Sequence, residues 1–200
     1  MGDMRKTVGI IGFGNMGSAI AEHIKDRYSV VVFDREKAKT DTLLGISLAA
    51  GISDLIKKVD VVILAVKPQD FDAVLEEIKK YIQGKLVISI AAGITTKYIE
   101  KILDKARVVR AMPNIGAKIG KSVTCLSKGN SALVSDLSLT SELFKYIGAT
   151  QDLPEKLMNE ATAISGSGPG YYFYKIGTAK PADPVKFQQD FIAELTEAAE

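Results

Sequence analysis

Three glycines near the start of the chain have a spacing that suits phosphate binding. Gly12, Gly14 and Gly17 follow an apolar run at residues 8–11 and precede a stretch whose apolar residues recur at the spacing of a helix. After a strand, the first glycine permits a tight turn, the second has no side chain to block a pyrophosphate, and the third lets the helix lie close to the sheet. Free amide groups at the helix N-terminus then face the phosphate charge. The turn predicted to bind a dinucleotide consists of Gly12, Phe13, Gly14, Asn15, Met16 and Gly17.

An acidic residue ends the next apolar run and gives a second signal. Asp34 lies twenty positions after Gly14, where a carboxylate commonly binds the ribose hydroxyls of NAD. Arg35 and Lys37 follow at once, and cations at this place can hold the 2′-phosphate of NADP. The two signals conflict. We therefore predict NADH or NADPH as cofactor, with Asp34 and Arg35 among its contacts.

Three further loops are expected at the same edge of the sheet, because ligands of open α/β sheets bind outside the carboxyl ends of the strands. One follows the apolar run 61–66 and is shaped by Pro68. The next, after the run 86–90, has small residues that let a flat ring approach the backbone. The third ends in Asn114, whose amide can hydrogen-bond a ribose or a carboxamide. The cofactor contacts predicted from these loops are Ala65, Val66, Lys67, Pro68, Ala91, Ala92, Gly93 and Asn114.

Few other side chains in the sequence could support catalysis. His23 is the only histidine and Cys125 the only cysteine, so neither a Ser-His-Asp set nor a His/Cys metal centre can be assembled, and no metal is predicted. We expect His23 on a helix surface and Cys125 buried in a strand as a small hydrophobic residue. A single cysteine cannot form an intramolecular disulfide, which favours a reducing, cytoplasmic setting.

Composition excludes several classes of protein. The 200 residues include 26 Lys and Arg against 24 Asp and Glu, and this near balance argues against electrostatically driven nucleic-acid binding. The longest apolar run, at 61–66, is far shorter than the ~20 residues that span a bilayer, so no membrane partner is expected. At about 100 to 200 residues per domain, the length allows one α/β domain and the start of a second.

The strands and helices that must position these residues are predicted to alternate along the sequence. Apolar runs of strand length alternate with amphipathic stretches to about residue 150, which is typical of parallel βαβ units and predicts a doubly wound α/β sheet of the Rossmann type. Ser53 or Asp54 is expected to cap one helix and Thr95 another. We place a domain boundary near Leu153, because the pattern changes beyond Pro154. The predicted strands lie at 8–11, 30–33, 46–48, 61–66, 86–90, 108–109 and 122–126, with helices at 71–81, 133–146 and 155–164 among those between and after them.

Five motifs in this order resemble those of pyrroline-5-carboxylate reductases. They are Gly12–Gly17, Ala65–Gln69, Ser89–Ile94, Arg110–Asn114 and Ser165–Pro169. The first occurs in many related dehydrogenases, whereas the later four in this order are specific, and the similarity covers about residues 7 to 174. The resemblance implies reduction of Δ1-pyrroline-5-carboxylate to L-proline, the last step of proline biosynthesis, with NADPH or NADH as hydride donor.

The same resemblance implies a substrate site and a second domain. Glu155 and Thr162 would lie near the pyrroline ring as catalytic residues, Thr162 bonding the ring nitrogen and Glu155 favouring its cationic form. Ser165 and Gly166 would join them in binding the substrate. Residues 1–153 would form the dinucleotide-binding domain and 154–200 the start of an all-helical dimerisation domain, which implies a homodimer or higher homo-oligomer. The family's Ser/Thr/Gly-rich loop for the substrate carboxylate does not occur before residue 200, so we expect this domain to be incomplete.

Two other functions stay open from the sequence. One is a dehydrogenase of the β-hydroxyacid type, although no motif for the catalytic lysine of those enzymes occurs by residue 200. The other is an NAD(P)-binding module that does not catalyse and acts as a redox sensor or binds a partner.

Overall fold

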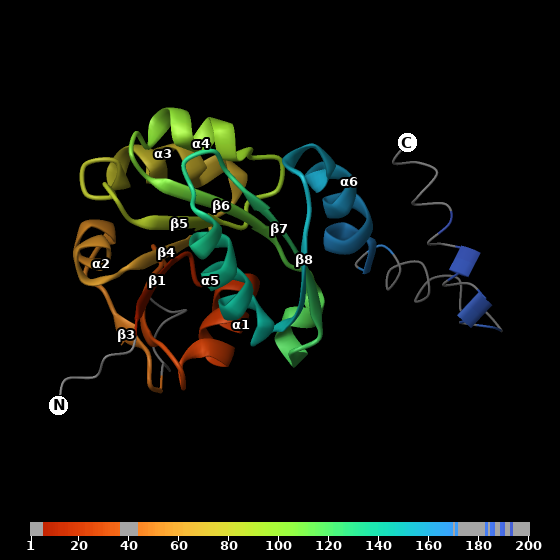
Figure 1. The fold of residues 1–200 in the computed structure, drawn as a ribbon. Coiled ribbons are helices and arrows are strands. Elements are labelled where there is room, and N and C mark those ends of the chain that lie inside the picture. Colours follow the sequence, from red (N-terminus) through yellow and green to blue (C-terminus); the bar gives the residue numbers. More distant parts are fainter. Residues whose placement is uncertain are drawn as a thin grey trace.

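A computed structural model describes residues 6–36 and 44–169, together with residues 171, 183, 185, 186, 189, 190 and 193. The strands in this part form one eight-stranded sheet in the order β3-β2-β1-β4-β5-β6-β7-β8 (Figure 1). They are β1 (Thr7–Ile11), β2 (Ser29–Phe33), β3 (Ser47–Leu48), β4 (Val61–Leu64), β5 (Leu86–Ser89), β6 (Arg107–Met112), β7 (Ser122–Lys128) and β8 (Gly148–Asp152). The first six run parallel, β7 pairs antiparallel with β6, and β8 runs parallel to β7. The expected doubly wound, mainly parallel sheet is confirmed.

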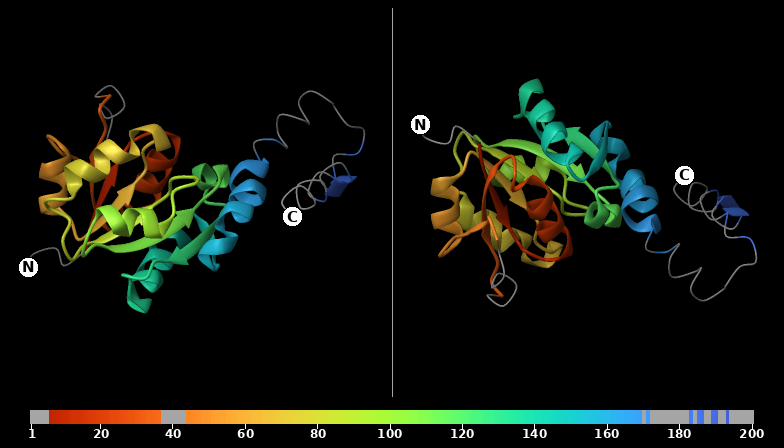
Figure 2. Two further views of the ribbon diagram at one scale, coloured as in Figure 1. Left: turned by 90° about the horizontal axis from the view of Figure 1, so that it is seen from above. Right: turned by 90° about the horizontal axis from the view of Figure 1, so that it is seen from below.

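Helices cover both faces of this sheet. They are α1 (Asn15–Ile24), α2 (Ile52–Lys58), α3 (Pro68–Ile78), α4 (Thr96–Ile102), α5 (Val134–Lys145) and α6 (Met158–Ala161), with the 3₁₀ turns η2 (Ile115–Ile119) and η3 (Glu155–Leu157) and the π-helical segment η4 (Thr162–Ser167). Apolar residues of α1 and α5 pack on one face, and those of α2, α3 and α4 pack on the other. At the end of the sheet away from β3, η3, α6 and η4 lie beyond β7 and β8 (Figure 2).

Strand β4 shows why the sheet needs two helical layers. Val61 and Ile63 belong to the core beneath α1 and α5, whereas Val62 and Leu64 belong to the core beneath α2, α3 and α4. All four side chains are buried. A strand that is apolar on both faces is stable only between two layers, so this run alone indicates a central parallel strand.

Two local expectations were wrong. Helix α2 is capped by Gly51, because Asp54 lies inside the first turn, where its carboxylate accepts a hydrogen bond from the amide of Ala50 at 3.0 Å. The helix expected at 71–81 runs over Pro68–Ile78 instead, since proline fits the first position of a helix, where the missing amide hydrogen is not needed. Thr95 caps α4 as expected, accepting from the amide of Tyr98 at 3.2 Å.

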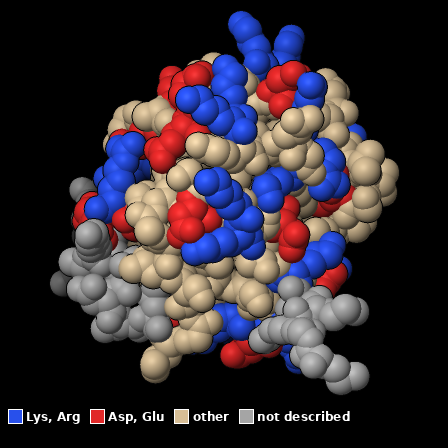
Figure 3. Space-filling view, turned by 90° about the vertical axis from the view of Figure 1, so that its left-hand side faces the viewer, with Lys and Arg blue, Asp and Glu red and all other residues tan. Residues whose placement is uncertain are grey.

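The described residues hold no helix long and apolar enough to cross a bilayer. On the face drawn in Figure 3, basic and acidic side chains are interspersed.

Candidate functional site

The glycine turn lies directly after β1, between the carboxyl ends of β2 and β4. Gly12 has a backbone φ of +97°, a region that glycine adopts without strain. Its amide donates to the carbonyl of Phe33 at 2.8 Å, and a Cβ at this position would lie 2.5 Å from the carbonyl oxygen of Ala65. The turn is therefore held tightly against both neighbouring strands.

The other two glycines serve different purposes. A Cβ on Gly17 would collide with the carbonyl oxygen of Gly12, so this glycine allows α1 to approach the turn. Gly14, the N-cap of α1, has open space where its Cβ would stand. Nothing in the described protein accounts for a glycine at that position, whereas a pyrophosphate against the backbone would. The geometry of the turn thus fits a dinucleotide.

Asp34 supports the turn from the end of β2. One carboxylate oxygen accepts a hydrogen bond from the amide of Phe13 at 2.6 Å, and the other accepts from the amide of Glu36 at 2.8 Å. Asp34 therefore fixes the backbone on both sides of the turn between β1 and β2. This supporting role was not predicted from the sequence.

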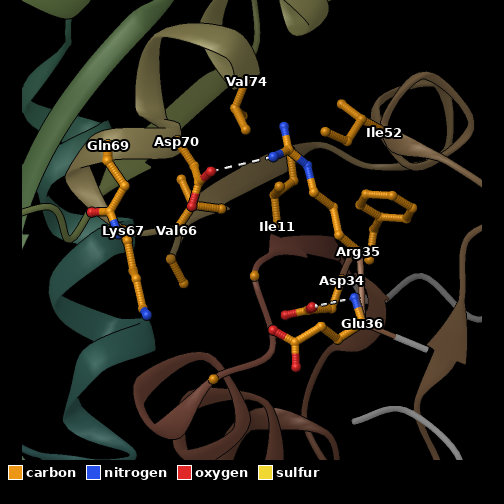
Figure 4. A pocket seen from close by; sticks show the side chains of 14 residues that line it. Ile11, Asp34, Arg35, Glu36, Ile52, Val66, Lys67, Gln69, Asp70 and Val74 are labelled. Carbon is orange, nitrogen blue, oxygen red and sulfur yellow. Dashed lines mark hydrogen bonds and ion pairs between the residues drawn. The ribbon is translucent and has the colours of Figure 1, made fainter. Parts of the chain in front are cut away.

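A cleft of about 330 Å³ opens beside the turn (Figure 4). Seven of its lining residues were predicted as cofactor contacts, namely Gly12, Gly14, Asp34, Arg35, Ala65, Val66 and Lys67. Glu36, Gln69 and Asp70 also line it and were not predicted as cofactor contacts. Asp70, in the first turn of α3, accepts a hydrogen bond from the guanidinium of Arg35 at 3.2 Å. The cleft is concave, part apolar and part charged, as expected for the adenosine end of a dinucleotide.

The remaining predicted cofactor residues surround the same edge of the sheet without lining this cleft. Pro68 is the first residue of α3, and residues 91–93 connect β5 to α4. Asn114 follows β6, where its side chain accepts from the amide of Gly116 at 3.1 Å and donates to the hydroxyl of Ser165 at 3.4 Å. This last contact places a predicted cofactor residue beside a predicted substrate residue.

A buried ionic cluster connects β6 to the segment that follows β8. The guanidinium of Arg110, only 1% exposed, donates to the carboxylate of Glu155 at 3.0 Å and to the side chain of Asn159 at 3.2 Å. The same oxygen of Glu155 accepts from the amide of Thr96 at 3.3 Å. Within the described residues, the second oxygen of Glu155 and Nε of Arg110 are buried without a hydrogen-bond partner. The sequence did not predict that Glu155 pairs with Arg110, or that Arg110 is buried.

Thr162 lies at the start of η4, two turns beyond Glu155. Its hydroxyl donates to the carbonyl of Met158 at 2.6 Å, so its oxygen is left to act as an acceptor. Gly166, further along η4, packs near the side chain of Met112 at the end of β6. The predicted substrate residues therefore form one segment next to the carboxyl end of β6.

One cation near the turn was also missed. Lys118, in η2, donates from Nζ to the side chain of Asn15 at 3.1 Å, at the first residue of α1. The sequence does not indicate this contact, because Lys118 and Asn15 are 103 positions apart.

The isolated residues behave as expected. Cys125 is buried in β7, and this burial raises the pKa of its thiol. His23 lies half-buried on α1, with its ring hydrogen-bonded to the carbonyl of Ala19. In the described part of the chain, no three His, Cys, Asp or Glu side chains are close enough to hold a metal ion.

Comparisons with known proteins agree with this arrangement. A family model described as "NADP oxidoreductase coenzyme F420-dependent" matches residues 7–93. The pyrroline-5-carboxylate reductase of Methanosarcina acetivorans is 36% identical over 176 residues, covering 83% of this chain and 65% of that protein. The enzyme of the same name from Schizosaccharomyces pombe is 31% identical over 188 residues, covering 81% of this chain and 67% of that protein. This chain thus spans about two thirds of the length of the curated relatives it matches.

A solved structure gives the same result for the fold. The structure of a pyrroline-5-carboxylate reductase from Coxiella burnetii matches 98% of this chain and 78% of that chain, with a TM-score of 0.81 at 28% sequence identity. With the glycine turn at its expected place in this fold and a relative covered over two thirds of its length at more than 30% identity, the chain belongs to the pyrroline-5-carboxylate reductase family.

Proposed function

We propose that this chain carries the cofactor site, and the first part of the substrate site, of an enzyme that reduces Δ1-pyrroline-5-carboxylate to L-proline with NADPH or NADH. The observation that carries the proposal is that the motifs shared with the family lie together: the glycine turn, the loop after β4, the loop after β5 and Asn114 share one sheet edge, and Ser165 contacts Asn114. The curated relatives bear the name of this activity.

The cofactor contacts proposed are those predicted from the sequence. The amides of the glycine turn would bind the pyrophosphate, Asp34 and Arg35 would face the adenosine ribose, and the loops after β4 and β5 would contact the rest. When bound, the reduced nicotinamide supplies a hydride. The protein's own task is to orient the two reactants and exclude water.

In the reduction, a hydride adds to the imine carbon and the ring nitrogen keeps its proton, which gives a secondary amine. Thr162 suits the role of an acceptor for that N–H, because its own hydroxyl proton is engaged by the carbonyl of Met158. Glu155 supplies a negative charge that favours the cationic imine, and Arg110 holds its position. Ser165 and Gly166 complete the part of the substrate site proposed for this chain.

The finer assignments are also proposals. We assign residues 1–153 to the dinucleotide-binding domain and 154–200 to the beginning of a helical substrate and dimerisation domain. The latter supports a homodimer or higher homo-oligomer, which sedimentation at high protein concentration tests, since a monomer alone would contradict it. A cytoplasmic location rests on the single cysteine.

The experiment that tests the function is a paired assay. Binding of NADH and NADPH is measured by fluorescence, and oxidation of the bound cofactor is then followed after pyrroline-5-carboxylate is added. The proposal expects both binding and oxidation. Thr162→Ser should keep the oxidation rate, and Thr162→Val should lower it without changing cofactor affinity.

Two results would count against the proposal. Binding without oxidation would leave a cofactor-binding module. Unchanged oxidation in both Thr162→Val and Glu155→Gln would show that these side chains do not contact the substrate.

A further inference from the structure

We infer that Glu155 is a positioning residue for the nicotinamide end of the cofactor, because it holds the loop after β5 (residues 90–95) through the backbone amide of Thr96. The inference rests on the proposed cofactor site, where the small residues of this loop admit the flat nicotinamide ring. It is separate from the charge that Glu155 is proposed to supply to the substrate, since it concerns a contact within the protein itself.

Hydrogen bonds hold this loop at both of its ends. At its start, the amide of Ala91 donates to the hydroxyl of Ser89, which is fully buried in β5, at 3.3 Å. At its end, the amide of Thr96, the first residue of α4, donates to Oε1 of Glu155 at 3.3 Å. The first anchor belongs to the same strand as the loop. The second comes from η3, 59 positions further along the chain.

The middle of the loop has room for a ligand. Ala92 and Gly93 are exposed. Gly93 has a φ of +75°, which explains why a glycine stands there, and no atom lies within 4 Å of the place where its Cβ would be. A flat ring can therefore approach this backbone. A shift at either anchor would move the backbone relative to the ring.

Arg110 fixes the carboxylate that forms the second anchor. Its guanidinium, which is 1% exposed and always charged, donates to the same oxygen of Glu155 at 3.0 Å and to the side chain of Asn159 at 3.2 Å. The amide of Thr96 and the guanidinium thus share one carboxylate oxygen, between β6 and the start of α4. Moving Glu155 would leave the buried guanidinium without its anion, which is costly. The anchor is therefore a fixed point.

The same part of the chain then bears on both reactants. Glu155 holds the proposed nicotinamide loop, and Thr162 and Ser165, a few residues later, are proposed to face the substrate. A misplacement of about 1 Å between reacting groups can cost about a hundredfold in rate. A direct bond from this segment to the loop is a means of keeping the hydride donor aligned with its acceptor.

Thr96→Pro removes this contact without changing either charged side chain. Proline suits the first position of a helix, and Thr95 before it already has the extended backbone, with ψ of 155°, that a following proline requires. The substitution deletes the amide hydrogen that Glu155 accepts. The ion pair between Glu155 and Arg110 stays in place.

Val134→Pro is the matched control. Val134 is the first residue of α5 and also follows a residue with extended backbone, Leu133. Helix α5 begins at the opposite edge of the sheet, where Asp136 pairs with Arg107, the first residue of β6, at 2.7 Å. This substitution introduces the same residue at the same helix position, away from the cofactor loops.

The experiment measures dissociation constants of the full chain for NADH and for ADP-ribose by calorimetry. ADP-ribose keeps the adenosine and the pyrophosphate but lacks the nicotinamide. We expect Thr96→Pro to weaken binding of NADH about three- to tenfold, as for one lost hydrogen bond, and to change binding of ADP-ribose by less than about twofold. Glu155→Ala, which removes the acceptor, should give the same selective loss, and Val134→Pro should change neither constant.

The fluorescence of bound NADH gives a second measurement, because it reports on the nicotinamide alone. Its emission maximum should move toward that of free NADH in Thr96→Pro and stay unchanged in Val134→Pro. Glu155→Ala leaves the guanidinium of Arg110 buried without an anion, so Thr96→Pro decides the result if that variant does not fold.

Unchanged binding of NADH in Thr96→Pro would overturn the inference. Equal weakening of NADH and ADP-ribose would do the same, because it would indicate a general loss of the cofactor site, and so would a selective loss in Val134→Pro. Binding of neither ligand by the unmodified chain would remove the cofactor site and the inference with it. None of these measurements uses pyrroline-5-carboxylate. A selective loss of NADH binding in Thr96→Pro, with no oxidation of NADH by pyrroline-5-carboxylate in the unmodified chain, would contradict the proposed reaction and support the inference.

Discussion

At the scale of single residues, the glycine turn separates the space that folding needs from the space that a ligand needs. Gly12 and Gly17 are required by the protein itself, one for its positive φ and one because α1 approaches the carbonyl of Gly12. Gly14 is required for neither of these two reasons, because its φ is ordinary and no atom stands near its Cβ position. The spacing of the three glycines is visible in the sequence, but this division of roles becomes visible only when neighbouring atoms are in place.

The division predicts opposite results for two similar substitutions. Gly14 has an ordinary φ of −78° and open space at its Cβ position, so Gly14→Ala should change the free energy of unfolding by less than about 1 kcal/mol. The added methyl group would occupy the place of the pyrophosphate and should weaken binding of both cofactors at least about tenfold. Urea unfolding and a fluorescence titration measure the two effects.

Gly17→Ala is the control for that substitution. Its methyl group meets the carbonyl of Gly12, so it should lower the free energy of unfolding by about 1 to 3 kcal/mol. Cofactor affinity that survives in Gly14→Ala would show that the phosphates do not lie against this backbone.

At the scale of elements, the pair formed by Arg110 and Glu155 attaches the segment after β8 to the end of β6. Arg110 is 1% exposed and Glu155 29% exposed, so Arg110→Met leaves a partly exposed carboxylate without its cation and should cost about 2 kcal/mol of unfolding free energy. Glu155→Gln leaves the guanidinium of Arg110, which is 1% exposed, without an anion, so it should cost about 3 kcal/mol. The double variant should cost less than the sum, because neither charge is left alone.

Urea unfolding of the four proteins in this cycle measures the coupling directly. Additive effects of the two substitutions would mean that the ion pair does not join these elements. Limited proteolysis gives a second measurement. The segment after β8 should be cleaved faster in Arg110→Met than in the unmodified chain.

A second contact between elements predicts a pH dependence. The hydroxyl of Tyr28, just before β2, donates to Glu142 on α5 at 2.8 Å. Burial raises the pKa of Tyr28 well above its ordinary value, and the bond to Glu142 raises it further. Because the folded state holds this proton more tightly, the stabilisation is complete below about pH 10 and is lost as the pH rises toward the higher folded pKa.

Tyr28→Phe should therefore remove a slope of about 1.4 kcal/mol per pH unit from the stability curve above about pH 10. Unfolding by urea at a series of alkaline pH values measures that slope. Glu142→Gln, which removes the charge of the acceptor, should reduce the same slope in part. A Tyr28→Phe curve parallel to the unmodified one would contradict this account.

Two strands, β4 and β8, show where prediction of elements from the sequence succeeds and where it fails. Strand β4 was predicted because four apolar residues in a row need burial on both faces. Strand β8 was missed, because Gly148–Asp152 has no apolar run and is held by backbone pairing with β7 at the edge of the sheet. Side-chain periodicity reports burial, so a polar edge strand leaves no such pattern.

At the scale of the whole molecule, the strand order explains why the predicted site residues meet. The chain leaves β1 toward β2 and β3 on one side and returns to β4 on the other, so the order reverses between β1 and β4. Ligands of open α/β sheets bind at such a reversal, outside the carboxyl ends of the strands. This rule allowed the cofactor loops to be grouped from sequence. It could not pair Arg35 with Asp70, or Lys118 with Asn15, because side-chain partners across the cleft depend on tertiary packing.

The cleft joins residues of β1, β2, α3 and the loop after β4, and this gives a prediction for the stability of the chain as a whole. A cofactor that binds only the folded cleft, at a hundred times its dissociation constant, should stabilise the protein by about 2.7 kcal/mol. For a chain of 200 residues, this corresponds to a rise in Tm of about 5 to 10 °C. Differential scanning calorimetry with NADH measures this rise.

Gly14→Ala at the same NADH concentration is the control. Its Tm should rise much less, because its fold is intact but its phosphate site is blocked. An equal rise in both proteins would place the bound NADH away from the glycine turn.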